Sequence, residues 1–298
     1  MPPSPASAPL GNPQWQHKDV NVGGVRLHVV EAGPPDGPLV VLLHGFPEFW
    51  YSWRHQIQPL ADAGFRVLAP DLRGYGDSDK PSGVRSYAIE RLVDDVAGLV
   101  AASGRTSAHL VGHDWGAAIA WMVANDRPEV VDRLAILNVP HPQRLVEGLR
   151  HSAEQRKKSW YIGFFQLPWL PERLIRRGDF AMLRSMLRRD PVHPGAFSPE
   201  EIEAYVDALK RPGAVTAAVN YYRAAARGMW RIRGRFRRLE MPVLVLWGDR
   251  DRYLSRAFAE PPPELVPDCR LVHFAASHWL PCDAPLEVND ELLRFLRP

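Results

Sequence analysis

One acidic residue, Asp114, stands where an apolar run gives way to an alanine-rich segment, in the order Gly112-His113-Asp114-Trp115-Gly116. The run before it is typical of a buried strand, and the segment after it is typical of a helix. Such a strand-to-helix turn lifts its central side chain above a sheet and points the next N–H at a reacting oxygen. A carboxylate with a reference pKa near ~3.9 is already an anion at neutral pH, so we expect Asp114 to act as a nucleophile and form an ester. The alternative is a structural role as the cap of the following helix.

Two later segments offer partners for this nucleophile. His278 lies in a loop just after the last predicted strand, and a loop histidine beside Trp279 is poorly explained as core filling. Asp249 and Asp251 both follow the preceding predicted strand. Asp251 lies far enough past that strand to turn back toward the histidine, whereas Asp249 suits the turn itself. We therefore expect Asp251 to orient His278, which would activate the water that cuts the ester.

Backbone donors for a developing oxyanion are predicted at two turns. The segment His44-Gly45-Phe46-Pro47 follows an apolar run, and a sharp turn there would expose a backbone N–H. Together with the N–H of Trp115, this turn would supply two hydrogen bonds to an oxyanion. An ordinary strand-to-helix connection is the alternative for this segment.

The sequence predicts neither a cofactor site nor a metal site. Gly74-Tyr75-Gly76 lacks the third glycine of a dinucleotide-binding turn and the lysine of a phosphate-binding loop. His273 and His278 have no Cys or Glu cluster near them in the sequence, so the pattern is a poor match to a metal centre. We therefore expect chemistry carried by protein groups alone.

The composition restricts the class of protein and its partners. The chain has 298 residues, of which 46% are hydrophobic and 24% charged, which allows one large core or two modest domains. The formal net charge is +3 and no basic tract alternates with aromatic residues, so nucleic acid is not an expected partner. With only two cysteines, Cys269 and Cys282, a disulfide framework is excluded and a reducing compartment is favoured.

The first 18 residues are rich in proline and predict a disordered lead-in. They lack the charged start and apolar centre of a signal peptide, and no stretch of the chain is apolar for long enough to cross a bilayer. We therefore expect a cytoplasmic protein without stable membrane insertion. The sequence leaves a homodimer open.

Strand and helix patterns alternate over most of the chain, which predicts an α/β fold with a mostly parallel, twisted sheet and helices on both faces. The predicted strands cover residues 25–31, 39–44, 65–70, 134–138, 241–248, 270–274 and the run into Asp114, and the predicted helices cover 53–63, 87–103, 117–125 and 285–296. The Gly- and Pro-rich turn at 32–38 predicts a hairpin-like connection between the first two of these strands.

Residues 141–235 interrupt this alternation with helical periodicity and repeated prolines. A helical insert between strands of one sheet lies over the carboxyl ends of those strands, where open α/β sheets bind ligands. We therefore expect a helical lid inserted after the sixth strand, on a core formed by 19–140 and 236–298. The insert holds 18 Lys or Arg and 9 Asp or Glu. A solvated helical face explains this charge simply, and a membrane or anionic-ligand surface is the alternative.

Three motifs occur in order: His44-Gly45-Phe46-Pro47-Glu48, Asp71-Leu72-Arg73-Gly74-Tyr75-Gly76-Asp77-Ser78 and Gly112-His113-Asp114-Trp115-Gly116. They closely resemble the motifs of α/β-hydrolase-fold epoxide hydrolases, and the resemblance extends from about residue 20 to 296. It implies a nucleophile at Asp114, a base at His278, an acid at Asp251, and oxyanion N–H groups at Phe46 and Trp115. The reaction it implies converts a small apolar epoxide and water to a vicinal diol.

The resemblance also implies two lid tyrosines that hydrogen-bond the epoxide oxygen. The segment 159–166 points to Tyr161, and the run Asn220-Tyr221-Tyr222-Arg223 points to Tyr222, with the adjacent Tyr221 left open. A phenol with a reference pKa near ~10 can stabilise or protonate a departing alkoxide without being ionised at rest. Packing of the lid on the core is the alternative role for both tyrosines.

Aromatic side chains of the lid suggest an apolar substrate pocket formed by Trp160, Phe164 and Phe165. Packing within the core of the lid is the alternative, since aromatic residues at helical spacing commonly have that role. Two other functions remain open. A haloalkane or haloacid dehalogenase of the same fold would use Asp114 to displace halide but would need no phenols. A non-catalytic ligand-binding protein of this fold would need neither nucleophile, base nor acid.

Overall fold

Within residues 10–232 and 236–297, which the computed structural model describes, eight strands form one sheet in the order β1-β2-β4-β3-β5-β6-β7-β8. The strands are β1 Gln16–Val22, β2 Val25–Ala32, β3 Leu39–Leu43, β4 Arg66–Pro70, β5 Ala108–His113, β6 Val131–Leu137, β7 Val243–Gly248 and β8 Cys269–Phe274. The pairs β1–β2 and β2–β4 are antiparallel, and the other neighbours are parallel. The predicted α/β fold with a mostly parallel sheet is confirmed.

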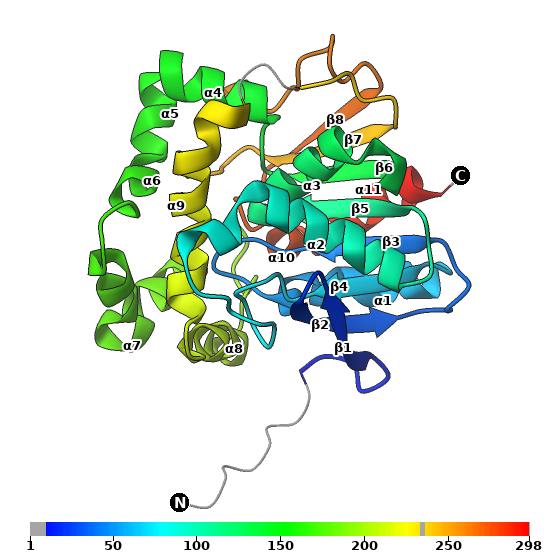
Figure 1. Cartoon of the computed structure of the whole chain (residues 1–298), viewed down its shortest axis with the longest axis horizontal. Coiled ribbons are helices and arrows are strands. Elements are labelled where there is room, and N and C mark those ends of the chain that lie inside the picture. Colours follow the sequence, from blue (N-terminus) through cyan, green and yellow to red (C-terminus); the bar gives the residue numbers. More distant parts are fainter. Residues whose placement is uncertain (1–9, 233–235, 298) are drawn as a thin grey trace, which may run out of the picture.

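Helices cover both faces of this sheet (Figure 1). The core helices are α1 Arg54–Asp62, α2 Ile89–Ala102, α3 Trp115–Asp126, α10 Leu280–Asp283 and α11 Pro285–Leu296, with short 3-10 turns η1 Trp50–Trp53, η2 Val84–Tyr87, η3 Pro128–Val130 and η4 Arg256–Phe258. In α2, the predicted apolar stripe is the buried one and includes Leu92, Val96 and Leu99. In α3, most side chains are buried, because this helix lies between the sheet and other helices. The sheet and its helices therefore share one continuous apolar core.

In the described part of the segment between β6 and β7, six further helices stand together along one side of the sheet (Figure 1). They are α4 Pro142–His151, α5 Ala153–Lys158, α6 Trp160–Phe164, α7 Leu170–Arg189, α8 Pro199–Lys210 and α9 Ala214–Ile232. The start of α8 shows how the local sequence sets a helix boundary. This helix begins with a capping box between Ser198 and Glu201, which satisfies otherwise unpaired N–H groups. We call α4 to α9 the inserted helices.

A buried arginine joins the inserted helices to the core. Arg54 of α1 donates from Nε to Glu201 Oε1 at 2.5 Å and from Nη2 to the carbonyl of Ala196 at 3.1 Å. Its Nη1 lies 3.3 Å from the hydroxyl oxygen of Tyr205. A guanidinium buried with several acceptors holds their positions, because losing any one of them would leave a desolvated donor unpaired.

Two predictions about the first strands were wrong. The segments 25–31 and 39–44 do not form a hairpin, since β4 lies between β2 and β3 in the sheet. Every side chain of β3 is buried, as expected for a central parallel strand rather than one arm of a hairpin. The predicted lead-in is also too long, because β1 begins at Gln16 and Trp15 is buried. Residues 1–9 lie outside the described residues.

Among the residues described, no helix is both long and apolar enough to cross a membrane.

Candidate active site

The turn that carries Asp114 holds this residue in a conformation that few side chains adopt. Asp114 has φ 49° and ψ −121° between β5 and α3, and such backbone strain persists only where the surroundings enforce it. Two glycines allow the turn to pack so closely. A Cβ on Gly116 would lie 2.0 Å from the carbonyl oxygen of Leu43, and one on Gly45 would lie 2.2 Å from the Cβ of Asp114. The glycines thus set the raised position of Asp114.

Each oxygen of the Asp114 carboxylate has its own partner. The N–H of Phe46 donates to Oδ1 at 2.7 Å, and Nε2 of His278 lies 3.3 Å from Oδ2. Burial alone would raise the pKa of Asp114, but the hydrogen bond and charge of His278, aided by the Phe46 N–H, outweigh it and lower this pKa. The carboxylate is therefore an anion throughout the neutral range.

His278 is held between two carboxylates. Its Nδ1 lies 2.7 Å from Oδ2 of Asp251, opposite the nitrogen that faces Asp114. Burial alone would lower the pKa of His278, yet the charges and hydrogen bonds of Asp251 and Asp114 raise it to about 10. The imidazole therefore carries a proton in the free enzyme at neutral pH.

Asp251 is the carboxylate that meets the histidine, as predicted. Its Oδ2 also accepts from Nδ2 of Asn138 at 2.8 Å, and its Oδ1 accepts from the N–H groups of Tyr253 and Leu254 at 2.6 and 2.9 Å. Burial would raise the pKa of Asp251, but His278 and these donors together lower it.

Asp249, the rival candidate, faces away from His278. Its carboxylate lies 2.6 Å from Nδ1 of His273 and 3.2 Å from Nη1 of Arg256. Of the two acids after β7, only Asp251 is therefore in contact with the histidine.

The predicted oxyanion donors are the backbone N–H groups of Phe46 and Trp115. The Phe46 N–H already binds Asp114. Trp115 is the first residue of α3, and the first N–H groups of a helix have no acceptor within it. The helix dipole also favours negative charge at this end. The Phe46 N–H thus contacts the Asp114 carboxylate, and the Trp115 N–H belongs to the next residue, at the start of α3.

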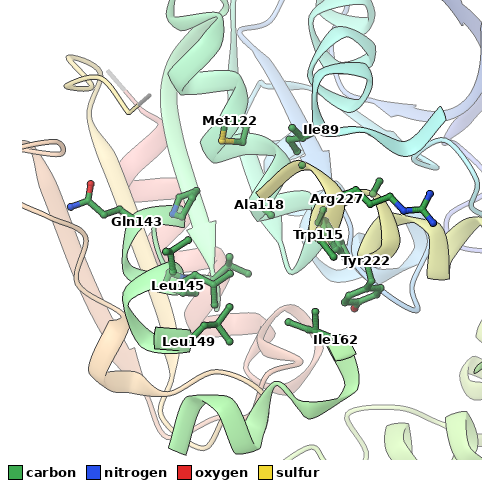
Figure 2. Close-up of a pocket in the computed structure, with 18 of the residues that line it drawn as sticks. Ile89, Trp115, Ala118, Met122, Gln143, Leu145, Leu149, Ile162, Tyr222 and Arg227 are labelled. Atoms are coloured by element: carbon green, nitrogen blue, oxygen red, sulfur yellow. The ribbon is translucent and has the colours of Figure 1, made fainter. Parts of the chain in front are cut away.

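Asp114 lines a cavity of about 1110 Å³, which Figure 2 shows with Trp115 and Tyr222 on its wall. Tyr161 of α6 and Tyr222 of α9 both line it, and their ring centroids are 5.7 Å apart. Burial, reinforced by the charge of Asp114, raises the pKa of both phenols above the ordinary value. Both are therefore neutral donors at rest.

The structure separates the two neighbouring tyrosines of α9. The hydroxyl of Tyr221 donates to the carbonyl of Arg73 at 2.7 Å, and this residue does not line the cavity among the described residues. Tyr222 faces the cavity and packs edge-on against Trp115 at 5.0 Å. Of this pair, Tyr222 is the one placed beside Asp114.

The predicted pocket residues Trp160, Phe164 and Phe165 do not line this cavity in the described part of the chain. Trp160 is 66% exposed. Phe165 is buried behind the tyrosines, with ring centroids 4.8 Å from Tyr222 and 5.9 Å from Tyr161. The prediction failed because successive residues of a short helix point in different directions, and only Tyr161 and Ile162 of α6 face inward.

Apolar side chains from four helices form the cavity wall instead (Figure 2). They include Ile89, Met122, Leu145, Leu149 and Ile162. None of these residues belongs to a local motif, and only their positions on α2, α3, α4 and α6 bring them together.

Sequence reasoning missed a buried pair beneath the nucleophile. Nδ1 of His113 lies 2.8 Å from Oε2 of Glu48, and its Nε2 lies 2.7 Å from the carbonyl of His278. Oε2 of Glu48 also accepts from the N–H of Gly45 at 3.1 Å. This network connects the Gly45 turn to the histidine loop. Its signal was present in the sequence, because Glu48 and His113 belong to the first and third motifs.

One group of described residues, His28, Asp71 and Asp77, has the spacing of a metal site. Its central carboxylate is already used, since Asp71 accepts from the N–H groups of Trp50 and Asp77 and contacts Nδ1 of His28. This donor set is therefore explained by the fold of the segment.

Known proteins resemble this chain over nearly its whole length. Residues 38–185 match the family described as the alpha/beta hydrolase fold. The AB hydrolase superfamily protein YfhM of Bacillus subtilis is 43% identical, over 93% of this chain and 96% of its own. Epoxide hydrolase A of Mycobacterium tuberculosis is 36% identical, over 96% of this chain and 98% of its own.

Solved structures of epoxide hydrolases also resemble this chain. An epoxide hydrolase from Bacillus megaterium superposes with a TM-score of 0.85 at 34% identity, covering 94% of this chain and 99% of that chain. Epoxide hydrolase A from Mycobacterium thermoresistibile gives a TM-score of 0.82, also at 34% identity, covering 95% and 98%. With the site described above, these similarities show that the chain belongs to the epoxide hydrolases of the α/β-hydrolase fold.

Proposed function

We propose that this epoxide hydrolase converts an apolar epoxide to a vicinal diol through an alkyl ester on Asp114. One observation carries the proposal: the floor of an apolar cavity holds the Asp114 carboxylate in contact with His278, and two neutral phenols line the same cavity. A nucleophile, a base and acid donors are the groups that such a two-step hydrolysis needs.

Ring opening begins at Oδ2 of Asp114. Oδ1 accepts a hydrogen bond from the Phe46 N–H at 2.7 Å, whereas Oδ2 has the longer contact, 3.3 Å from Nε2 of His278. The less tightly held Oδ2 forms the new bond to an epoxide carbon while the carbon–oxygen bond of the ring breaks. The electron pair of that bond goes to the epoxide oxygen, which takes a proton from Tyr161 or Tyr222. The imidazolium of His278 supplies the proton that returns the tyrosine to its neutral form.

In ester hydrolysis His278 acts as a base, whereas in ring opening it donates a proton. Esterification removes the charge of Asp114, one of the two carboxylates that raise the pKa of His278, so the imidazole becomes a stronger acid and is left neutral after its proton has gone. It then takes a proton from water that attacks Cγ of Asp114. The N–H groups of Phe46 and Trp115 stabilise the oxyanion that forms at Oδ1, and release of the diol restores the carboxylate.

The inserted helices act in this proposal as a lid over the core. The lid comprises residues 141–235 and the core residues 19–140 and 236–298. The lid contributes Tyr161, Tyr222 and part of the apolar wall, and excluding water around the reacting atoms strengthens each hydrogen bond there. An apolar epoxide and water are the two substrates.

A single-turnover experiment in oxygen-18 water tests the ester. Water attacks the carbonyl carbon of the ester, so one turnover with excess enzyme should place the label in the Asp114 carboxylate, located by peptide mass analysis. Label found only in the diol would show direct hydration of the epoxide and overturn the proposal.

A comparison of products tests the epoxide reaction against displacement of halide. Dehalogenation produces no alkoxide and would not require the two phenols beside Asp114. We expect diol formation from a panel of apolar epoxides to exceed halide release from matched haloalkanes. Faster halide release would assign the site to dehalogenation.

A further inference from the structure

Large hydrophobic side chains are exposed mainly on one part of the inserted helices. In the described residues the exposed ones are Leu10, Trp160, Leu167, Trp169, Met182 and Leu286. Four of these six lie between residues 160 and 182. Trp160 and Trp169 are each 66% exposed. Clustered exposed aromatic side chains on a single segment indicate a binding surface rather than scattered surface residues.

Cations without a carboxylate partner lie in the same part of the inserted helices. Between residues 156 and 189, seven basic residues are exposed: Arg156, Lys157, Arg173, Arg176, Arg177, Arg188 and Arg189. The salt bridges of this stretch involve Lys158 and Arg184 instead, and no carboxylate pairs with the seven within the described part of the chain. The stretch therefore presents apolar groups and free positive charge together.

The two kinds of side chain meet in one groove. Trp169, Leu170 and Leu174 line a groove along α7 together with Arg173, Arg176 and Arg177. Thr216 and Glu172 complete its lining, and the Glu172 carboxylate is paired with Arg223. Figure 1 shows α5, α6 and α7 along the side of the molecule that lies away from the sheet. We call the outward side of these three helices, residues 156–189, the α5–α7 face.

We propose that the α5–α7 face is a docking surface for an anionic phospholipid bilayer, on which the enzyme lies without inserting a helix. Tryptophan prefers the boundary between lipid headgroups and acyl chains, and arginine can reach phosphates from there. An apolar face with basic neighbours is the pattern of proteins that lie in this interface. Charge complementarity with an anionic leaflet therefore selects this occupant.

A second copy of the chain fits the same surface less well. A two-fold contact places one patch against the identical patch of the partner. The seven cations would then face seven cations, and the exposed carboxylate of this face, Asp179, is already paired with Arg184 and Lys210. An anionic bilayer instead attracts every one of these charges.

Docking by this face would also place the cavity near the bilayer. Trp160 is exposed, whereas the next residue of α6, Tyr161, lines the cavity beside Asp114. One short helix thus connects the docking surface to the site, so an apolar substrate dissolved in lipid would meet the enzyme at its lid.

Flotation with phospholipid vesicles tests the proposal without measuring catalysis. We expect the full-length protein to bind vesicles that contain phosphatidylglycerol, to bind phosphatidylcholine vesicles weakly, and to be released by salt. Leu167→Ala/Trp169→Ala and, separately, Arg176→Gln/Arg177→Gln should each weaken binding about tenfold. The matched controls are Leu286→Ala and Arg91→Gln/Arg297→Gln, which alter exposed residues outside the face and should bind normally.

Turnover of a water-soluble epoxide by each variant separates this proposal from the proposed reaction, because docking should not affect a dissolved substrate. The proposal is overturned if wild-type protein ignores anionic vesicles or if both face variants bind as well as the controls. It is also overturned if vesicle binding is absent and Leu167→Ala/Trp169→Ala converts a dimer to a monomer. The α5–α7 face would then be the interface with a second copy of the chain.

Discussion

The core supplies Asp114, Asp251 and His278 from loops at the ends of neighbouring strands, whereas the inserted helices supply Tyr161 and Tyr222. The core groups are locked by several hydrogen bonds each, as in the contacts of Asp251 with His278 and Asn138. The two tyrosines are held mainly by ring packing, with centroids 5.5 Å apart for Phe46 and Tyr222, and Tyr222 has one further hydrogen bond with the Trp115 side chain. The core, which must align the nucleophile with its base, is thus held by hydrogen bonds. The inserted helices, which receive the substrate, are held mainly by packing of aromatic rings.

This difference predicts where substitutions do the most damage. Asp114→Ala removes the atom that forms the ester, so turnover should fall by at least about 10⁴-fold. Diol formation measures the loss, and circular dichroism should show an unchanged fold. Turnover close to that of the wild-type enzyme would remove Asp114 from the chemistry.

The base and its acid should affect ester hydrolysis more than ring opening. In His278→Ala the ester still forms but is not hydrolysed, so intact-protein mass should increase by the mass of the substrate. Asp251→Asn should slow ester decay by about 10²- to 10⁴-fold, because it removes the charge that orients the imidazole and supports its positive form. Asp249→Asn is the matched control, since this side chain contacts His273 and Arg256. Greater damage from Asp249→Asn would contradict the assignment of the acid.

The lid tyrosines should affect the other step. In Tyr161→Phe/Tyr222→Phe the alkoxide loses both donors, so ring opening should slow by about 10²- to 10⁴-fold while decay of a preformed ester changes little. Each single variant retains one phenol and should lose less. Tyr221→Phe is the control, because its hydroxyl binds the carbonyl of Arg73. Rapid-quench measurement of ester formation and decay separates the steps, and normal ring opening in the double variant would exclude both phenols as donors.

The pH dependence of the two enzyme forms should differ at His278. In the free enzyme, Asp251 and Asp114 raise its pKa to about 10, and proton NMR of the imidazole should show this midpoint. In the ester, the charge of Asp114 is absent, so the decay rate should rise with pH to a plateau through a midpoint below about 10. An identical midpoint in both forms would contradict the role of Asp114 in this shift.

The same shift predicts a change in stability. The pKa of His278 is raised on folding from 6.5 to about 10, so folding favours its protonated form. This contribution is fully present below pH 6.5 and is lost as pH rises through about 10. Asp251→Asn should reduce it, as measured by the pH dependence of the free energy of unfolding.

The sequence predicted the core half of the site because each group sits in a local motif. Asp114 lies between two glycines that its turn requires, and Asp251 follows a strand at a distance that lets it turn back. The strand order was harder, since β4 separates β2 from β3 by a pairing that no short segment encodes. The prediction of the cavity wall failed for a related reason, because the direction in which a lid residue points depends on how its helix packs. Trp160 and Tyr161 are adjacent in the sequence, yet Trp160 is exposed and Tyr161 lines the cavity.

The smallest expected effect concerns these two sides of the lid. Leu149 of α4 lines the cavity (Figure 2), so Leu149→Ala removes apolar contact with the substrate and should lower kcat/KM for bulky apolar epoxides by about tenfold. The loss should shrink for the smallest epoxides, which leave that wall untouched. Trp160→Ala removes a larger side chain, but one that faces solvent, so both kcat/KM for a dissolved epoxide and the unfolding midpoint should stay close to those of the wild-type enzyme. Steady-state rates over a series of epoxides of increasing size measure both variants. If Trp160→Ala showed the size-dependent loss and Leu149→Ala did not, the substrate would bind along the outer aromatic side chains and not along the wall formed by α4.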